Sequence, residues 1–197
     1  MKKISSFEIR RQIFHAALGI ALIFLIELGI LNALRIFLIL IAGGIVSIIS
    51  RKFNIPIISW FLRMFERPEQ IKKFPGKGAI SYFIGVLLVV KLFSPEIALA
   101  SIAILALGDP LSHLVGQTLG KIKSPVSSRK MLEGNLVGAL VASFAASFFV
   151  TYIYAFTASF FALFLESIEI KMNDAIVNDN IVIPLAAGTA IMLMTGL

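Results

Sequence analysis

The chain has 197 residues, of which 58% are hydrophobic and 15% are charged, and its formal net charge is +7. Soluble domains carry about 25% charged residues, so this composition predicts an integral membrane protein. The absence of cysteine excludes disulfides, thiolate metal sites and cysteine nucleophiles, and two histidines are too few for a multi-histidine metal centre. Because the positive charge lies on no soluble domain, we do not expect nucleic-acid binding.

Seven apolar runs predict membrane-spanning helices. They cover residues 13–31, 34–50, 79–93, 96–109, 135–154, 157–168 and 181–197. The first run is long and lacks a small-residue cleavage pattern, so we expect a retained helix rather than a cleaved signal. A weak polar break separates 135–154 from 157–168, and one long tilted helix is the alternative to two. The predicted fold is an all-α polytopic bundle that forms a single domain over residues 1–197.

The distribution of cations predicts the orientation of this bundle. With a cytoplasmic N-terminus, sixteen of the eighteen lysines and arginines fall on the cytoplasmic side, and only Arg35 and Lys91 do not. These cations also attract anionic membrane lipids. The segment from Asn54 to Phe65 is too short to cross and contains Trp60, which predicts an interfacial helix with its aromatic side inward. The polar segments, and hence the active site, are expected on the cytoplasmic face.

Polar residues concentrate in the stretch LGDPLSHLVGQTLGKIKSPVSSRKMLEGN, which runs from Leu107 to Asn135. Asp109 ends an apolar run, and a carboxylate at a membrane boundary needs water, a partner or a bound cation. We predict that Asp109 is a metal ligand or a catalytic carboxylate, and a helix cap beside Pro110 is the alternative. His113 has no specific neighbour in the sequence and receives no role.

Phosphate-binding residue types follow Asp109 closely. Gly116 and Gly120 form a G-x-x-x-G pattern, then come four cations, and then Glu133 and Gly134. The cations are Lys121, Lys123, Arg129 and Lys130. Glycines let the backbone approach an anion, Lys and Arg neutralise phosphate oxygens, and carboxylates hold Mg²⁺ together with those phosphates. The stretch therefore predicts a polyphosphate site, although the Walker and protein-kinase motifs are absent.

Two other polar groups are candidates for the same site. Asp179, between two asparagines before the last apolar run, is predicted to be either a site residue or an N-cap. Glu8, Arg11 and His15 are spaced to share one helix face, with Arg11 as a phosphate or carboxylate partner. His15 is either part of the site or a satisfied interfacial histidine.

A stripe of small residues four apart begins beside Glu133. We call it the small-residue stripe, and its members are Gly134, Gly138, Ala142 and Ala146. Such a stripe predicts a close helix contact that brings Glu133 toward the other loops. It would also permit a homodimer.

Six ordered blocks resemble the CTP-dependent lipid kinases, a group that includes dolichol kinase, phytol kinase and the CTP-using diacylglycerol kinase. The blocks are the E-x-x-R-x-x-x-H-x-x-x-G pattern from Glu8 to Gly19, FPGKGAISYFIG from Phe74, GD at Gly108, G-x-x-x-G-K from Gly116, RKMLEGN from Arg129 and NDNIVIPLAAG from Asn178. The resemblance covers nearly the whole chain. It implies transfer of the γ-phosphoryl group of CTP to the hydroxyl of a membrane lipid alcohol, most simply a polyprenol such as dolichol, with a divalent metal.

The resemblance also implies roles for individual residues. The positions that match its polar motifs are Arg11, His15, Asp109, Lys130, Glu133, Gly134, Asp179 and Asn180. We assign Asp109, Glu133 and Asp179 to Mg²⁺ and catalysis, with one of them as the alternative base for the lipid hydroxyl. The other matched positions are assigned to CTP binding, together with four residues of the polar stretch. The resulting CTP-binding set is Arg11, His15, Gly116, Gly120, Lys121, Arg129, Lys130, Gly134 and Asn180. Gln12, Met131 and Asn135 depart from the family pattern.

Two rival functions follow from the same residues. A membrane cytidylyltransferase also uses CTP, Mg²⁺ and carboxylates, but its acceptor is already a phosphate and calls for further cations. A small transporter or structural membrane protein would place its polar residues near mid-membrane in broken helices. In this sequence the polar residues gather on one face instead, which favours the lipid kinase.

Overall fold

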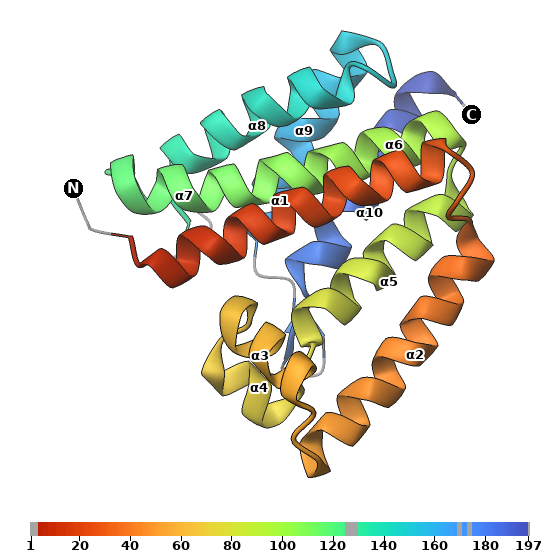
Figure 1. Ribbon diagram of the computed structural model, residues 1–197. Coiled ribbons are helices and arrows are strands. Elements are labelled where there is room, and N and C mark those ends of the chain that lie inside the picture. Colours follow the sequence, from red (N-terminus) through yellow and green to blue (C-terminus); the bar gives the residue numbers. More distant parts are fainter. Residues whose placement is uncertain (1–3, 125–129, 169–170, 173–174, 197) are drawn as a thin grey trace.

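The computed structural model describes residues 4–124, 130–168, 171–172 and 175–196 (Figure 1). Over these residues the protein is helical, with one antiparallel pair of two-residue strands, β1 (Lys171–Met172) and β2 (Ala175–Ile176). The helices are α1 (Ser6–Glu27), α2 (Ala33–Lys52), α3 (Pro56–Phe65), α4 (Pro68–Lys73), α5 (Lys77–Leu92), α6 (Pro95–Ala103), η1 (Ile104–Gly108), α7 (Asp109–Leu119), α8 (Leu132–Ala146), α9 (Tyr152–Glu166) and α10 (Asp179–Thr195). The predicted all-α architecture is confirmed.

Among the described residues, three stretches of helix are long and apolar enough to cross a membrane. They are Ser6–Glu27, Ala33–Lys52 and Pro95–Leu119. Each of the seven predicted apolar runs overlaps a helix, although the bounds of several differ. Several of these helices are short: a 15-residue helix such as α8 is about 22 Å long, whereas the hydrocarbon core is about 30 Å thick. The apolar helices agree with a membrane protein, while the number of crossings and the orientation stay predictions.

The centre of the bundle is one helical rod, Pro95–Leu119, formed by α6, η1 and α7. It runs alongside α1 in Figure 1. The sequence predicted an end at Asp109, because Pro110 has no N–H and its ring clashes with a carbonyl one turn earlier in an α-helix. This prediction is wrong. The wider π-helical turn of η1 directly precedes Asp109 and accommodates the proline, so the rod continues to Leu119.

The apolar run from 135 to 168 forms two helices rather than one. The helix α8 ends at Ala146, and α9 begins at Tyr152. The predicted break near 154–157 is therefore misplaced. The observed turn over residues 147–151 reads SFFVT and is itself largely apolar, so hydropathy alone does not mark it.

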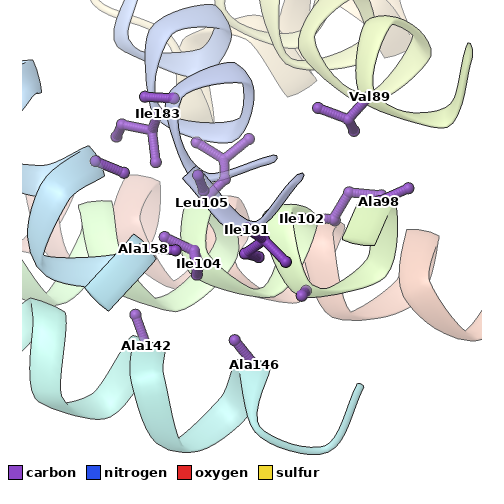
Figure 2. Close-up of a cluster of buried hydrophobic side chains, with 14 of the residues drawn as sticks. Val89, Ala98, Ile102, Ile104, Leu105, Ala142, Ala146, Ala158, Ile183 and Ile191 are labelled. Carbon is purple, nitrogen blue, oxygen red and sulfur yellow. The ribbon is translucent and has the colours of Figure 1, made fainter. Parts of the chain in front are cut away.

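The core lies where small side chains let the rod approach its neighbours (Figure 2). Bulky residues of the rod meet alanines of α8 and α9 on one side and isoleucines of α10 on another. The labelled buried residues are Val89, Ala98, Ile102, Ile104, Leu105, Ala142, Ala146, Ala158, Ile183 and Ile191. Dispersion between closely packed helices holds such a bundle together where lipid removes most of the hydrophobic effect.

The small-residue stripe of α8 packs against the rod, as predicted. A Cβ on Gly134 would lie 2.2 Å from the carbonyl oxygen of Ser112, and one on Gly138 would lie 2.6 Å from that of Gly108. Only glycine allows this approach. Because the stripe faces the rod of its own chain, it offers no surface to a second copy, and the predicted homodimer does not rest on it.

Gly134→Ala is expected to destabilise the protein by about 1–3 kcal/mol, since its Cβ overlaps the Ser112 carbonyl and α7 and α8 must separate. Gly43→Ala on α2 is the matched control, because a Cβ there meets no described atom within 4 Å. Thermal unfolding in detergent measures the difference. Equal midpoints for the two variants would contradict this packing.

The helix α3 occupies most of the segment predicted to be interfacial. Phe61 and Phe65 point inward and pack on Phe14 of α1, with ring centroids 5.1 and 4.5 Å away. Trp60 is 59% exposed and points outward. The predicted inward aromatic side is therefore present, but the tryptophan does not belong to it.

Candidate functional site

The candidate site is centred on Asp109, the first residue of α7, which directly follows η1. His113 lies one turn later on the same helix, with its Nε2 3.6 Å from Asp109 Oδ1. Two further carboxylates come from helix ends, because Glu166 is the last residue of α9 and Asp179 is the first residue of α10. Ligand atoms of these four side chains all lie within 4.8 Å of one another. We call these four residues the Asp109 cluster.

Lys130 is buried against the Asp109 cluster. Its Nζ forms an ion pair with Glu166 and lies 3.8 Å from Asp109 Oδ1. Burial lowers the pKa of Lys130, but the carboxylates of Glu166 and Asp109 raise it more, so the pKa lies above its usual value. The ammonium is therefore charged at neutral pH and partly neutralises the cluster. Arg129, the neighbouring predicted phosphate ligand, lies outside the described residues.

The donor set of the cluster fits the predicted Mg²⁺. Asp109 Oδ1 and Glu166 Oε2 are buried and accept no hydrogen bond from any residue that the structure describes. Buried carboxylate oxygens are costly unless a donor or a cation satisfies them. Three carboxylates supply the oxygen ligands that hard divalent ions prefer, and the imidazole of His113 adds a nitrogen.

Glu133, the third predicted metal ligand, lies outside the Asp109 cluster. Its carboxylate accepts hydrogen bonds from the backbone N–H groups of Lys121 at 3.0 Å and Ile122 at 3.1 Å. Its own backbone N–H and those of Lys121 and Ile122 hold the pKa of Glu133 below its usual value. In this position Glu133 orders the start of the loop that carries Lys121.

Arg11 and His15 reach the site from α1. Arg11 Nη2 donates to Glu8 Oε1 at 2.6 Å, and His15 Nε2 lies 3.7 Å from Asp109 Oδ2. The prediction that Glu8, Arg11 and His15 share one helix face is confirmed. Because Glu8 holds the guanidinium, Arg11 is fixed at the edge of the site.

Asp179 and Asn180 open α10 next to the cluster. The N-cap is Asn178, whose side-chain oxygen accepts from the backbone N–H of Asn180, so the alternative that Asp179 is the N-cap is wrong. Asn180 Nδ2 donates to Gly78 O at 3.1 Å and to Ser81 Oγ at 2.9 Å. These bonds tie the start of α10 to the start of α5.

The glycine-rich turn before α5 is fixed by a glutamate that the sequence did not mark. Glu66 accepts hydrogen bonds from the backbone N–H of Gly76 at 2.7 Å and from that of Gly78 at 3.1 Å. Gly76 has a φ of 79°, in the left-handed region that favours glycine. Both glycines line the same cavity as the Asp109 cluster.

The predicted phosphate-binding glycines of α7 also serve packing. A Cβ on Gly120 would lie 2.5 Å from Met131 Cγ, and one on Gly116 would lie 3.5 Å from Met131 Cβ. Gly116, Gly120 and Lys121 nevertheless line the cavity, so a ligand there would meet them.

Sequence reasoning missed His113 and Glu166. His113 received no role because it has no specific neighbour in the sequence. In α7 it follows Asp109 by four residues, and positions i and i+4 of a helix share a face. The alternative that Asp109 is a helix cap is wrong, because the rod runs through it. Glu166 closes an apolar run, and its meeting with Asp109 depends on the packing of α9, which no local signal reveals.

A cavity of about 1120 Å³ opens onto the Asp109 cluster. Its polar side is lined by Arg11, His15, Asp109, His113, Lys121, Lys130 and Asp179. Its apolar side is formed by α1 and α3, and is lined by Phe14, Leu18, Phe61, Leu62 and Phe65. The volume exceeds the range of about 300–1,000 Å³ typical of small-molecule pockets. Charged and polar side chains line one part of the cavity, and apolar side chains line another.

The chain is 30% identical to the CTP-dependent diacylglycerol kinase 1 of Schizosaccharomyces pombe over 133 residues, which are 66% of this chain and 61% of that protein. This match supports membership of the CTP-dependent lipid kinase family. The chain spans about 61% of the length of this relative. No protein-family model and no solved structure matches the chain.

The three residues at which this chain departs from the family pattern make local contacts. Gln12 Nε2 donates to Glu8 Oε1 at 2.9 Å, and Asn135 Nδ2 donates to Ser167 Oγ at 2.6 Å. Met131 packs against the glycines of α7. None of the three belongs to the Asp109 cluster, so these departures leave the metal-ligand set of the described structure intact.

Proposed function

We propose that this protein transfers the γ-phosphoryl group of CTP to the hydroxyl of a membrane lipid alcohol. The observation that carries the proposal is a single cavity that joins the Asp109 cluster and its cations to an apolar wall. Phosphoryl transfer requires cations that offset developing charge and a protein that aligns donor and acceptor, with little covalent help. The relative from S. pombe is named for CTP and for a lipid acceptor, which supports both substrates.

The proposed reaction exchanges one phosphorus–oxygen bond for another. The hydroxyl oxygen of the lipid bonds to the γ-phosphorus, while the bond from that phosphorus to the β–γ bridging oxygen breaks, so lipid phosphate forms and CDP leaves. The hydroxyl proton passes to a carboxylate at the cavity wall. Asp109 and Asp179 both line the cavity and are the candidates for this base.

Metal binding is assigned to the Asp109 cluster. Asp109, Asp179, Glu166 and His113 would hold the ion. When bound, Mg²⁺ neutralises charge on the β- and γ-phosphates.

The triphosphate would be held by cations around that cluster. Arg11, Lys121 and Lys130 line the cavity, and each would donate to phosphate oxygens. The sequence adds Arg129 to this set. His15 would contact the reacting groups beside Asp109, since its Nε2 lies 3.7 Å from Asp109 Oδ2.

We further propose a polytopic arrangement with seven crossings, a cytoplasmic N-terminus and a site on the cytoplasmic face. Three helices of sufficient length support a polytopic arrangement, the seven apolar runs of the sequence support the number of crossings, and the uneven distribution of cations supports the orientation. The proposed acceptor is a polyprenol such as dolichol. Diacylglycerol is the second candidate, because the S. pombe relative is named a diacylglycerol kinase.

The cavity favours a kinase over a cytidylyltransferase. An acceptor that is already phosphorylated calls for a second set of cations opposite the first. The wall on that side carries Phe14, Phe61 and Phe65, and the cation next to them, Arg67, lies 3.8 Å from the Glu8 carboxylate. Such a wall suits an uncharged hydroxyl on a hydrocarbon chain.

Purified protein in detergent with Mg²⁺ and a panel of lipid alcohols, given CTP labelled at either the α or the γ phosphate, tests this function. We expect label to enter the lipid fraction only from the γ position, and the labelled lipid identifies the acceptor. Transfer of the α label to an added lipid phosphate would replace the kinase with a cytidylyltransferase. Absence of transfer from both positions would favour the transporter or structural alternative.

A further inference from the structure

The apolar end of the cavity is a seam between α1 and α3. Phe14 of α1 stacks on Phe65 at 4.5 Å between ring centroids and meets Phe61 edge-on at 5.1 Å. Phe61 and Phe65 lie 4.9 Å apart. All three rings line the cavity, and we call them the aromatic trio.

The helix α3 carries exposed apolar side chains as well as the ones that line the cavity. Phe61, Leu62 and Phe65 line the cavity, whereas Ile57 and Trp60 do not line it and are 80% and 59% exposed. With 10 residues, α3 is about 15 Å long and cannot cross a bilayer. A short helix with large exposed apolar side chains is suited to the membrane interface. The exposed side chains of α3 then meet lipid, while Phe61, Leu62 and Phe65 form the cavity wall.

The aromatic trio borders the reacting groups directly. Phe14 immediately precedes His15, whose Nε2 lies 3.7 Å from Asp109 Oδ2, and both residues line the cavity. Leu18 extends the apolar wall by one further turn of α1. A molecule with a hydroxyl at one end and a hydrocarbon chain behind it matches this order of polar and apolar groups.

We propose that the aromatic trio and Leu18 bind the part of the hydrocarbon chain next to the acceptor's hydroxyl, and that the acceptor enters from the bilayer through the seam between α1 and α3. This inference rests on the proposed function and names the part of the site that selects the acceptor. The chain lies along the rings with its hydroxyl toward Asp109. Its far end remains in the bilayer.

The test compares Phe61→Ala and Phe65→Ala with Trp60→Ala, which shortens an exposed aromatic side chain of the same helix that does not line the cavity. The acceptors are geraniol, farnesol and geranylgeraniol, which carry the same hydroxyl on chains of increasing length. We expect the two phenylalanine variants to raise KM about tenfold for each of the three alcohols, which share the part of the chain next to the hydroxyl, since apolar pocket contacts discriminate by roughly this factor. KM for CTP should stay near wild type, and Trp60→Ala should match wild type throughout.

Two results would overturn this assignment. One is a rise in KM for CTP equal to the rise for the alcohols, which would indicate a structural defect. The other is an equal effect of Trp60→Ala, which would remove the distinction between the cavity-lining and the exposed side chains of α3.

A second measurement separates this inference from the proposed function. Wild-type protein that transfers no γ label from CTP would refute the kinase, and binding is then read by photo-crosslinking with geranylgeraniol that carries a diazirine on its chain. Crosslinks concentrated in α1 and α3 support the site for the chain. Crosslinks spread evenly over the other helices overturn it.

Discussion

Asp109→Asn is expected to reduce γ-phosphoryl transfer on the order of a thousandfold while the protein stays folded. The carboxylate is the point where three groups converge: His15, His113 and Lys130 lie 3.7, 3.6 and 3.8 Å from its oxygens. An amide keeps the size of the side chain but removes the charge that would hold a divalent cation. The residual activity is read as γ label recovered in extracted lipid.

Glu96→Gln is the matched control for this substitution. Glu96 is exposed in the first turn of α6, at the far end of the rod that carries Asp109. The control should keep wild-type transfer. If Asp109→Asn loses its single peak in size-exclusion chromatography as well as its activity, the carboxylate has a structural role and the catalytic assignment is contradicted.

The positions of the helices were predictable because each helix follows from the apolar residues of its own segment. Their ends were less predictable, as the rod illustrates. A proline normally ends a helix, and the sequence carries no sign that η1 would adopt a wider turn before Pro110 and let the helix continue. His113 belongs to the site because it lies one turn after Asp109 in α7.

Some residues of the site can be recognised from their neighbours in the sequence, whereas the role of others depends on contacts between helices that are distant in the sequence. Asp109, Lys130 and Asp179 stand out locally, since each is a charged residue beside an apolar run, and the structure brings them together. Glu166 stands beside an apolar run as well, but whether such a carboxylate is exposed or buried depends on how α8, α9 and α10 pack. Glu133 shows the opposite case, because sequence places it among cations but does not reveal that it bonds to backbone amides.

Lys130→Met is expected to destabilise the folded protein by about 3–5 kcal/mol, because it breaks a buried ion pair by removing one partner. Glu166, the other partner, has a side chain that is 0% exposed. After the substitution its carboxylate remains buried in the Asp109 cluster without the ammonium that compensates its charge. The apparent midpoint of thermal unfolding in detergent should fall by roughly 10 °C.

The double variant Lys130→Met/Glu166→Leu separates stability from catalysis. Replacing both members of a buried ion pair by apolar groups is often neutral, so the double variant should regain most of the stability that Lys130→Met loses. It should still lack γ-phosphoryl transfer, since the ammonium and the carboxylate both lie in the cluster assigned to the phosphates and their cation. A double variant as unstable as Lys130→Met would show that the two charges do not compensate each other. One that transfers phosphate at the wild-type rate would remove both residues from the proposed active site, and Asp109 and Asp179 would then have to hold the metal without Glu166.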